Sequence, residues 1–170
     1  NKIERRKFSE PIAYITNKKD FWKSTFIVSN YTLIPRPDSE IIIESIVKYI
    51  PSKKEKWNIL DLGTGSGCLI ISILQEYPNS WGKGIDISPE IISVAKKNQN
   101  LIKNKSRLVF EVADFSEYDT SDFDLIIANP PYVPIEDKEQ MNNEVLLFEP
   151  LMAIFPPESS EFFYEKIIKN

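Results

Sequence analysis

The stretch "NILDLGTGSGCLIISILQEY", residues 58–77, decides the fold. Its first five residues read as a short buried strand and its last ten as a helix, and the turn between them carries Gly63, Gly65 and Gly67 at alternate positions. Alternate glycines let the backbone turn tightly and approach a ligand, and the start of the helix presents free N–H groups. A dinucleotide-binding turn prefers Gly-x-Gly-x-x-Gly, whereas this turn has Gly-x-Gly-x-Gly with Asp61 two residues ahead. The stretch therefore predicts a ligand-binding strand–turn–helix unit.

Strands and helices alternate on both sides of this unit. Further strands are predicted at 81–87, 107–113 and 123–129, and further helices at 37–50 and 89–102. Because helices separate the strands, the connections are parallel crossovers, and the sequence predicts an α/β fold with a mostly parallel sheet in the order 3-2-1-4 and flanking helices.

Three segments have weaker patterns. Residues 115–122 are short and acidic, so a single turn is expected there. After residue 132 the prolines predict a loop until about Ser159, followed by a helix. Before the sheet, two β-rich runs at 21–23 and 26–29 predict a short β-hairpin.

The expected domain boundary lies at the start of the first predicted helix, where Pro37, Asp38 and Ser39 supply start signals. Residues 1–37 are predicted to be an N-terminal linker with the hairpin, and residues 38–170 one domain. The chain starts with Asn1 and stops in the uncapped run "FFYEKIIKN", so we expect a fragment that is truncated at both ends.

Composition narrows the function classes. The 170 residues, 42% of them hydrophobic, are enough for one domain with a real core. The net charge of −4 is unlike the basic charge that is typical of nucleic-acid-binding proteins. No apolar run approaches the roughly 20 residues that span a bilayer. The chain has no histidine and one cysteine, Cys68, so we expect no metal site and a reducing, cytoplasmic location.

Polar residues follow the later strands of the predicted sheet. Asp86, beside Ile87, ends the second strand, where a carboxylate can accept hydrogen bonds from ribose hydroxyls. Its alternative role is to cap the following helix, for which Ser88 is the better candidate. Asp114 and Phe115 end the third strand, where they could hold an adenine amino group and cover its ring, or only form a turn.

"NPPY", residues 129–132, follows the fourth strand. The prolines force the backbone out of the sheet in a fixed shape. The amide carbonyl of Asn129 and the main-chain carbonyl of Pro130 are two acceptors that can grip an NH₂ group, on which Tyr132 could stack. An amide nitrogen is a poor nucleophile, and paired acceptors can orient it without histidine. Recognition of a flat NH₂ group on an sp² nitrogen is what this arrangement favours.

The glycine turn resembles motif I of the class I methyltransferases, and a nucleotide-binding oxidoreductase is the alternative. The order of "EPIAYIT", "FW", "IPRPDSE", "DLGTGSG", "DISPE", "NPPY" and "FEP" resembles the PrmC/HemK family of peptide-chain-release-factor glutamine methyltransferases. The resemblance runs from about Glu10 to Lys169. A sister family that methylates a ribosomal protein typically lacks the acidic pair Asp38 and Glu40, so the release-factor branch is favoured.

The resemblance implies a Rossmann-like methyltransferase core, S-adenosylmethionine as cofactor, and class I release factors as protein partners. Direct nucleic-acid and membrane partners are not expected. The implied cofactor-binding residues are Asp61, Gly63, Thr64, Gly65, Gly67, Asp86, Ile87, Asp114, Phe115 and Asn129. The implied substrate-binding residues are Arg36, Asn129, Pro130, Pro131 and Tyr132, and of these Asn129, Pro130 and Tyr132 are the expected catalytic residues.

Two departures from the family leave alternatives open. Asn17 stands where the family usually has glycine, and we expect it to tolerate a left-handed conformation. "FPPESSEF" replaces a glycine-rich stretch after "FEP". The open alternatives are methylation of an exocyclic amine of adenine or guanine in RNA or DNA, and a non-catalytic remnant of the family.

Overall fold

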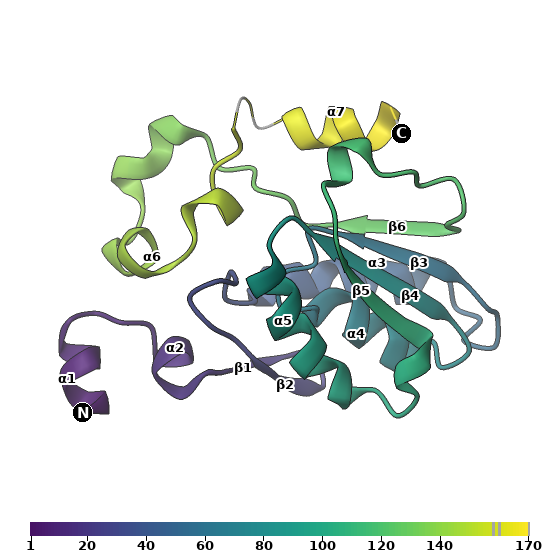
Figure 1. Ribbon diagram of the computed structural model, residues 1–170, viewed down its shortest axis with the longest axis horizontal. Helices are drawn as coiled ribbons and strands as arrows, with labels where there is room; N and C mark the ends of the chain where they lie inside the picture. Colours follow the sequence, from purple (N-terminus) through teal and green to yellow (C-terminus); the bar gives the residue numbers. More distant parts are fainter. Residues whose placement is uncertain (158, 160, 170) are drawn as a thin grey trace.

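A four-stranded parallel sheet forms the centre of the protein, whose computed structural model describes residues 1–157, 159 and 161–169 (Figure 1). The strand order is β5-β4-β3-β6, as the sequence predicts. The strands are β3 (Asn58–Leu62), β4 (Trp81–Asp86), β5 (Leu108–Val112) and β6 (Leu125–Ala128). The β/α alternation is therefore confirmed, and so is the class I methyltransferase-like arrangement.

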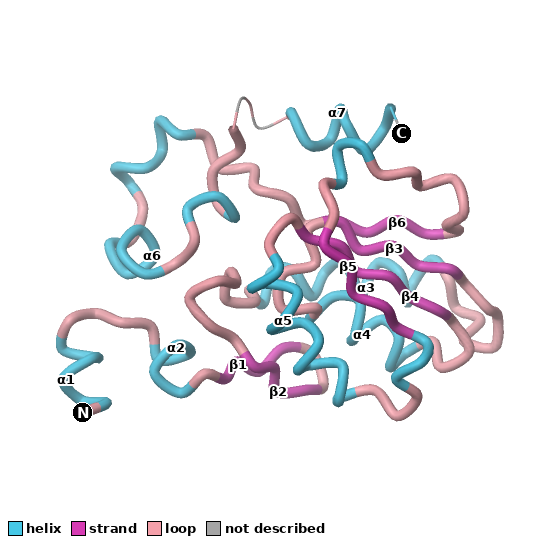
Figure 2. The backbone as a smooth tube through the Cα atoms, viewed as in Figure 1, coloured by secondary structure: helices cyan, strands magenta, loops and turns pink. Residues whose placement is uncertain are grey.

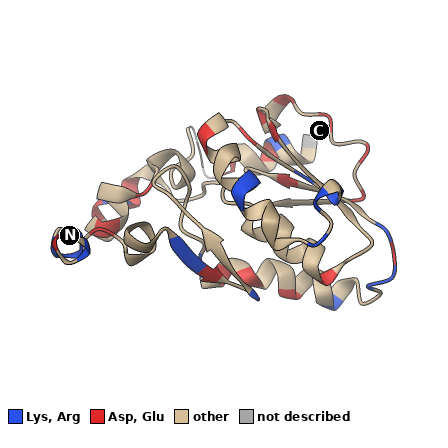
Figure 3. Ribbon diagram, turned by 60° about the horizontal axis from the view of Figure 1, so that its bottom comes forward, with Lys and Arg blue, Asp and Glu red and all other residues tan. Residues whose placement is uncertain are grey.

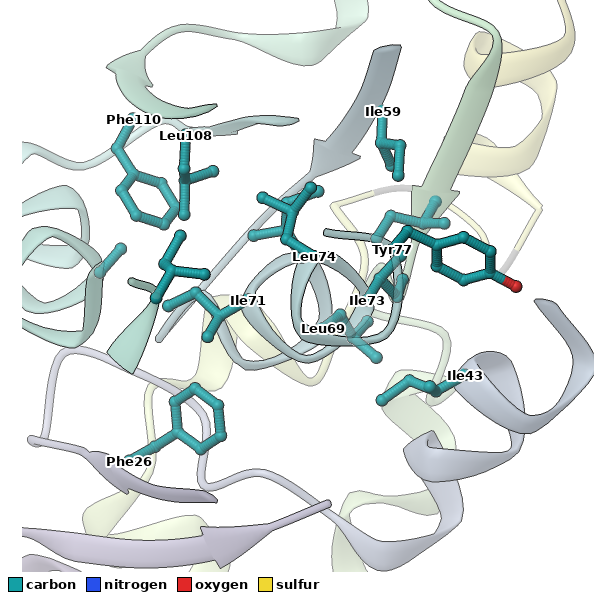
Figure 4. Close-up of a cluster of buried hydrophobic side chains, with 14 of the residues drawn as sticks. Phe26, Ile43, Ile59, Leu69, Ile71, Ile73, Leu74, Tyr77, Leu108 and Phe110 are labelled. Carbon is teal, nitrogen blue, oxygen red and sulfur yellow. The ribbon is translucent and has the colours of Figure 1, made fainter. Parts of the chain in front are cut away.

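One face of the sheet is covered by helices α3 (Glu40–Tyr49), α4 (Cys68–Glu76) and α5 (Pro89–Asn98). The core cluster in Figure 4 joins Ile43 of α3 and Leu74 of α4 to Ile59 of β3 and Phe110 of β5. Helix α4 is the most deeply buried of the three, because its apolar residues extend around most of its surface. It follows the glycine turn directly, so burial of α4 fixes that turn on the sheet.

The hairpin is present but shifted from its predicted position. Strands β1 (Lys18–Phe21) and β2 (Ser24–Ile27) pair antiparallel around a turn at Trp22, whose φ is 52°. The Trp22 backbone N–H donates to Glu40 Oε1 (2.7 Å) and its indole N–H to Glu76 Oε1 (3.0 Å). These bonds attach the hairpin to α3 and α4.

Two short helices precede the hairpin, α1 (Lys2–Lys7) and α2 (Ile12–Thr16), where the sequence analysis expects only a linker. Helix α2 ends at Asn17 with φ 55° and ψ 30°. This left-handed conformation is the one in which Asn can replace Gly, so that prediction is confirmed. The Tyr14 hydroxyl donates to the Thr32 carbonyl (2.7 Å) and connects α2 to the chain ahead of α3.

The segment after β6 contains short helical turns rather than the predicted continuous loop, as Figure 2 shows. The turns are short because prolines flank them. They are η5 (Ile135–Gln140), α6 (Asn143–Phe148) and η6 (Leu151–Ala153), and the predicted final helix is α7 (Phe162–Lys169). Positions 158 and 160 of the predicted loop lie outside the described residues.

Four further 3₁₀ turns complete the connections. They are η1 (Pro37–Ser39), η2 (Gln99–Leu101), η3 (Lys105–Arg107) and η4 (Phe115–Glu117). Turn η4 is the single turn expected for the fourth crossover. Within the described ranges, none of the helices is both long and apolar enough to cross a bilayer.

Candidate active site

A cavity of about 490 Å³ lies at the carboxyl edge of the sheet. This volume falls in the roughly 300–1,000 Å³ range of small-molecule sites. In Figure 1 the purple-blue segment before α3 and the green-yellow segment after β6 both approach this edge. Eleven of the predicted site residues line the cavity, namely Arg36, Gly63, Thr64, Gly65, Asp86, Ile87, Asp114, Phe115, Asn129, Pro130 and Pro131.

The three glycines of the turn have different roles. All three have positive φ, at 67°, 56° and 79° for Gly63, Gly65 and Gly67. A Cβ added at Gly63 or Gly65 meets nothing within 4 Å, whereas one at Gly67 lies 2.9 Å from Phe110 Cζ. Gly63 and Gly65 thus leave room for a ligand, and Gly67 makes room for the core. Gly67, predicted as a cofactor residue, does not line the cavity.

Asp61 lies beneath the turn, 1% exposed and outside the cavity lining. The Thr64 hydroxyl donates to Asp61 Oδ2 (2.6 Å), which holds the turn against the end of β3. Burial raises the pKa of the Asp61 carboxyl to about 7, although the bond from Thr64 opposes the shift. The structure therefore places Asp61 behind the residues that face the cavity.

Asp86 connects the second strand to the glycine turn, because its Oδ2 accepts a hydrogen bond from Gly65 N (3.0 Å). Burial raises the pKa of Asp86, and backbone N–H groups of Gly65, Ile87 and Ser88 oppose that shift. Ser88, not Asp86, caps α5. The capping alternative for Asp86 is thus excluded, and its carboxylate lies in the cavity wall.

Asp114 forms the turn that the sequence leaves open as one alternative, and it lies at the cavity as well. Its Oδ1 accepts from Ser116 N (2.9 Å) and caps η4, while the residue also lines the cavity. The Phe115 ring lies 5.0 Å from the Phe163 ring of α7, centroid to centroid. Two aromatic rings from distant parts of the chain therefore share the wall beside Asp114.

Asn129 lies next to the glycine turn because β6 pairs with β3, with Ala128 opposite Leu62. Its Nδ2 donates a hydrogen bond to Ser39 Oγ (3.2 Å). Among the described residues, nothing donates to Asn129 Oδ1 or to the Pro130 carbonyl. The two predicted acceptors are both available in the cavity wall.

Tyr132 does not join this group. It is 55% exposed and lies outside the cavity lining, whereas Pro131 lies within it. The main chain turns away after Pro131, since Val133 N donates to the Ile154 carbonyl (3.2 Å). The structure thus places no aromatic ring of "NPPY" where it could stack on a substrate in the cavity.

Arg36 lines the cavity but is already paired. Its Nη2 lies 2.5 Å from Glu149 Oε1, and Glu149 Oε2 accepts from Ile34 N (3.0 Å). The Glu149 side chain is 1% exposed. This carboxylate of the "FEP" motif joins the segment after β6 to the segment before α3, a role that the sequence analysis did not identify.

Several cavity residues were missed by sequence reasoning. Ser39 was interpreted as a helix start and as the residue that keeps the hydroxyl of the usual Thr in the family's "RPxTE" stretch, without a role in the cavity, and it makes no capping bond. Many of the others are apolar or aromatic residues whose type alone does not separate a cavity wall from a core, among them Tyr31, Leu33, Ile91, Met152, Phe155, Phe162 and Phe163. Within the described part of the chain, no group of three or more acidic or cysteine side chains is placed to hold a metal ion.

Comparison with known proteins gives the family. Residues 53–155 match the model of a methyltransferase domain. The chain is 40% identical over 167 residues to the release factor glutamine methyltransferase of Buchnera aphidicola subsp. Baizongia pistaciae, covering 98% of this chain and 59% of that protein. It is 38% identical to the bifunctional methyltransferase of Rickettsia bellii, covering 99% of this chain and 35% of that protein.

The fold is similar to that of the hMettl16 catalytic domain, whose crystal structure was solved in complex with the MAT2A 3'UTR hairpin 6. The TM-score is 0.64 at 16% identity, over 85% of this chain and 55% of that chain, so the likeness concerns the fold alone. The matches agree with S-adenosylmethionine as the predicted cofactor. The chain spans between about a third and three fifths of the length of these two relatives, and it belongs to the methyltransferase domain family.

Proposed function

We propose that the protein transfers a methyl group from S-adenosylmethionine to the side-chain amide nitrogen of a glutamine, in the Gly-Gly-Gln loop of class I peptide chain release factors. The carrying observation is the pair of unused acceptors, Asn129 Oδ1 and the Pro130 carbonyl, in one cavity with Gly63 and Gly65. The name of the Buchnera relative supports the glutamine substrate.

The cofactor would occupy the side of the cavity that lies at the carboxyl ends of β3, β4 and β5. Gly63 and Gly65 leave the space in which its methionine part would lie. Asp86 would accept hydrogen bonds from the ribose hydroxyls, and Asp114 with Phe115 would flank adenine. When bound, S-adenosylmethionine supplies an electrophilic methyl group on a sulfonium. This division assigns one half of the cavity to each reactant.

The acceptor side would work by position. Asn129 Oδ1 and the Pro130 carbonyl would accept hydrogen bonds from the two N–H groups of the substrate amide. They would thereby hold its nitrogen in line with the methyl group. Methyl transfer to the held nitrogen would leave the cofactor as a neutral thioether, and the nitrogen would lose one proton to water. The rigid acceptors reduce the reorganisation needed as charge shifts.

The partner and the location follow from the same proposal. A protein substrate suits the net charge of −4, and acidic and basic residues are interspersed along the ribbon in Figure 3. Translation takes place in the cytoplasm, and a single cysteine fits a reducing compartment. We also propose residue 38 as the start of the methyltransferase domain, after an N-terminal part that carries the hairpin.

The test is methyl transfer from labelled S-adenosylmethionine to a purified class I release factor. We expect label on the release factor and none after the glutamine of its Gly-Gly-Gln loop is replaced by alanine. Label that persists after this replacement would show that this glutamine is not the methylated residue. Label in a nuclease-sensitive product would identify the nucleic-acid alternative, and cofactor binding without transfer would identify a non-catalytic remnant.

A further inference from the structure

Ser39 occupies the N-cap position of α3 without capping it. Its φ and ψ are −70° and −14°, a helical conformation, and its side chain makes no capping hydrogen bond. A capping serine has an extended backbone, which directs its oxygen toward the N–H groups of the first turn. The Ser39 hydroxyl is therefore available for another partner.

That partner is the amide of Asn129, ninety positions away in the sequence. The Ser39 Oγ accepts from Asn129 Nδ2 at 3.2 Å, and both residues line the cavity. An unrestrained asparagine side chain can rotate and present either its NH₂ group or its oxygen. The Ser39 hydroxyl can donate or accept, and in this structure it accepts on the NH₂ side, which leaves the oxygen as the group offered to a ligand.

We propose that Ser39 is a positioning residue, which fixes the Asn129 carboxamide so that Oδ1 is presented to the substrate. The cavity then discriminates in favour of an NH₂ donor and against a carbonyl or ether oxygen, because a second acceptor repels Oδ1. The identity of the substrate rests on the proposed function, whereas the orientation of Asn129 is a property of this chain alone.

Ser39 is itself held in place by its surroundings. Turn η1 places it one residue before α3, and the Ser39 backbone N–H donates to the Arg36 carbonyl (3.0 Å). Arg36 in turn is paired with buried Glu149. The hydroxyl thus belongs to an anchored part of the chain, and it can orient Asn129 before any ligand binds.

The first measurement needs no turnover. The side-chain NH₂ resonances of Asn129 are recorded by NMR in the cofactor-free protein and assigned by their loss in Asn129→Asp. In Ser39→Ala we expect the hydrogen-bonded proton to shift upfield and to exchange faster with water, and in Ser39→Thr we expect resonances close to the native ones. Unchanged resonances in Ser39→Ala would overturn the proposal.

The second measurement separates positioning from cofactor binding. For Ser39→Ala we expect a fall of about tenfold in kcat, the size of one hydrogen bond, with the Kd of S-adenosylmethionine unchanged. Ser39→Thr keeps the hydroxyl and should recover most of kcat. Ser45→Ala removes a hydroxyl from the same helix, away from the cavity, and should behave as the native chain.

Three outcomes would contradict this role. A weaker cofactor Kd with unchanged kcat would make Ser39 a direct cofactor contact, and a Ser39→Thr variant as slow as Ser39→Ala would mean that the hydroxyl is not the active feature. An equal loss in Ser45→Ala would assign the effect to the helix. If the native chain transfers no methyl group to the release factor, the proposed function fails while the NMR comparison still tests Ser39.

Discussion

The two halves of the cavity are assembled in different ways. On the cofactor side, the hydrogen bonds join residues that are close in sequence, Thr64 to Asp61 three positions apart and Gly65 to Asp86 twenty-one apart. On the acceptor side, Asn129 and Ser39 are ninety positions apart. The glycine turn is thus held within two neighbouring strand–turn–helix units, whereas the contact of Asn129 with Ser39 depends on the packing of distant segments.

The two halves should therefore respond differently to substitutions. The glycine turn is fixed by β3, β4 and α4, so changes there act on local conformation and on ligand space. On the acceptor side, Asn129 follows the β6–β3 ladder, but its contact with Ser39 and the pair of Arg36 with buried Glu149 are individual long-range contacts. Loss of one such contact should release a whole segment.

The largest effect is expected for Glu149→Ala. Removing this carboxylate leaves the buried Ile34 N–H without its acceptor and the partly exposed Arg36 without its ion pair, which should lower the free energy of unfolding by about 3–4 kcal/mol. Urea unfolding measures the loss. Glu144→Ala is the matched control, because Glu144 pairs with Arg6 on the surface and should contribute less than about 1 kcal/mol. Similar losses for both variants would remove the distinction drawn here.

The second effect concerns pH and the cofactor side. The pKa of Asp61 is about 7 in the folded chain against 3.8 for the free group, so the folded state binds its proton more tightly. The resulting stability is complete below about pH 4 and is lost as pH rises through 7, by up to about 4 kcal/mol. Asp61→Asn cannot ionise, so its unfolding free energy should lack this fall. Parallel pH profiles from pH 4 to 8 would contradict the assignment.

The next comparison lies within the glycine turn. Gly67→Ala places a Cβ at positive φ and 2.9 Å from Phe110, so the unfolding free energy should fall by about 3 kcal/mol. Gly65→Ala meets no protein atom, so backbone strain alone should give about 1 kcal/mol.

Cofactor affinity should show the opposite order, because the new Cβ at position 65 projects into free space beside the cavity wall. Calorimetry with S-adenosylmethionine measures it on the folded proteins. Greater loss of affinity in Gly67→Ala than in Gly65→Ala would reverse the roles given to the two glycines.

The same contrast explains how far the sequence predicted the structure. Apolar runs, helical spacing and the three glycines predicted the strands, the helices over the sheet and the glycine turn, because each depends on neighbouring residues. The acceptor wall was predicted only at Asn129, Pro130, Pro131 and Arg36, which stand in recognisable motifs. The partners Ser39 and Glu149 could not be assigned, since their contacts depend on how separate segments pack.

Two other differences between the predicted and the observed structure have local causes. The hairpin is shifted because Trp22 adopts a left-handed conformation, uncommon for a bulky residue, that its bonds to Glu40 and Glu76 stabilise. Tyr132 was placed in the site as the "NPPY" residue that could stack on a planar substrate, but the chain turns toward Ile154 immediately after Pro131. A motif defines its residue types, and the backbone exit after it decides which side chains face the cavity.

The most direct test of the account is Asn129→Ala, measured for methyl transfer and cofactor binding in parallel. The account predicts a fall in kcat of roughly 100- to 1,000-fold, while calorimetry gives an unchanged Kd for S-adenosylmethionine. Native kcat in this variant, or loss of cofactor binding with it, would contradict the claim that Asn129 holds the substrate amide against a cofactor bound at the glycine turn.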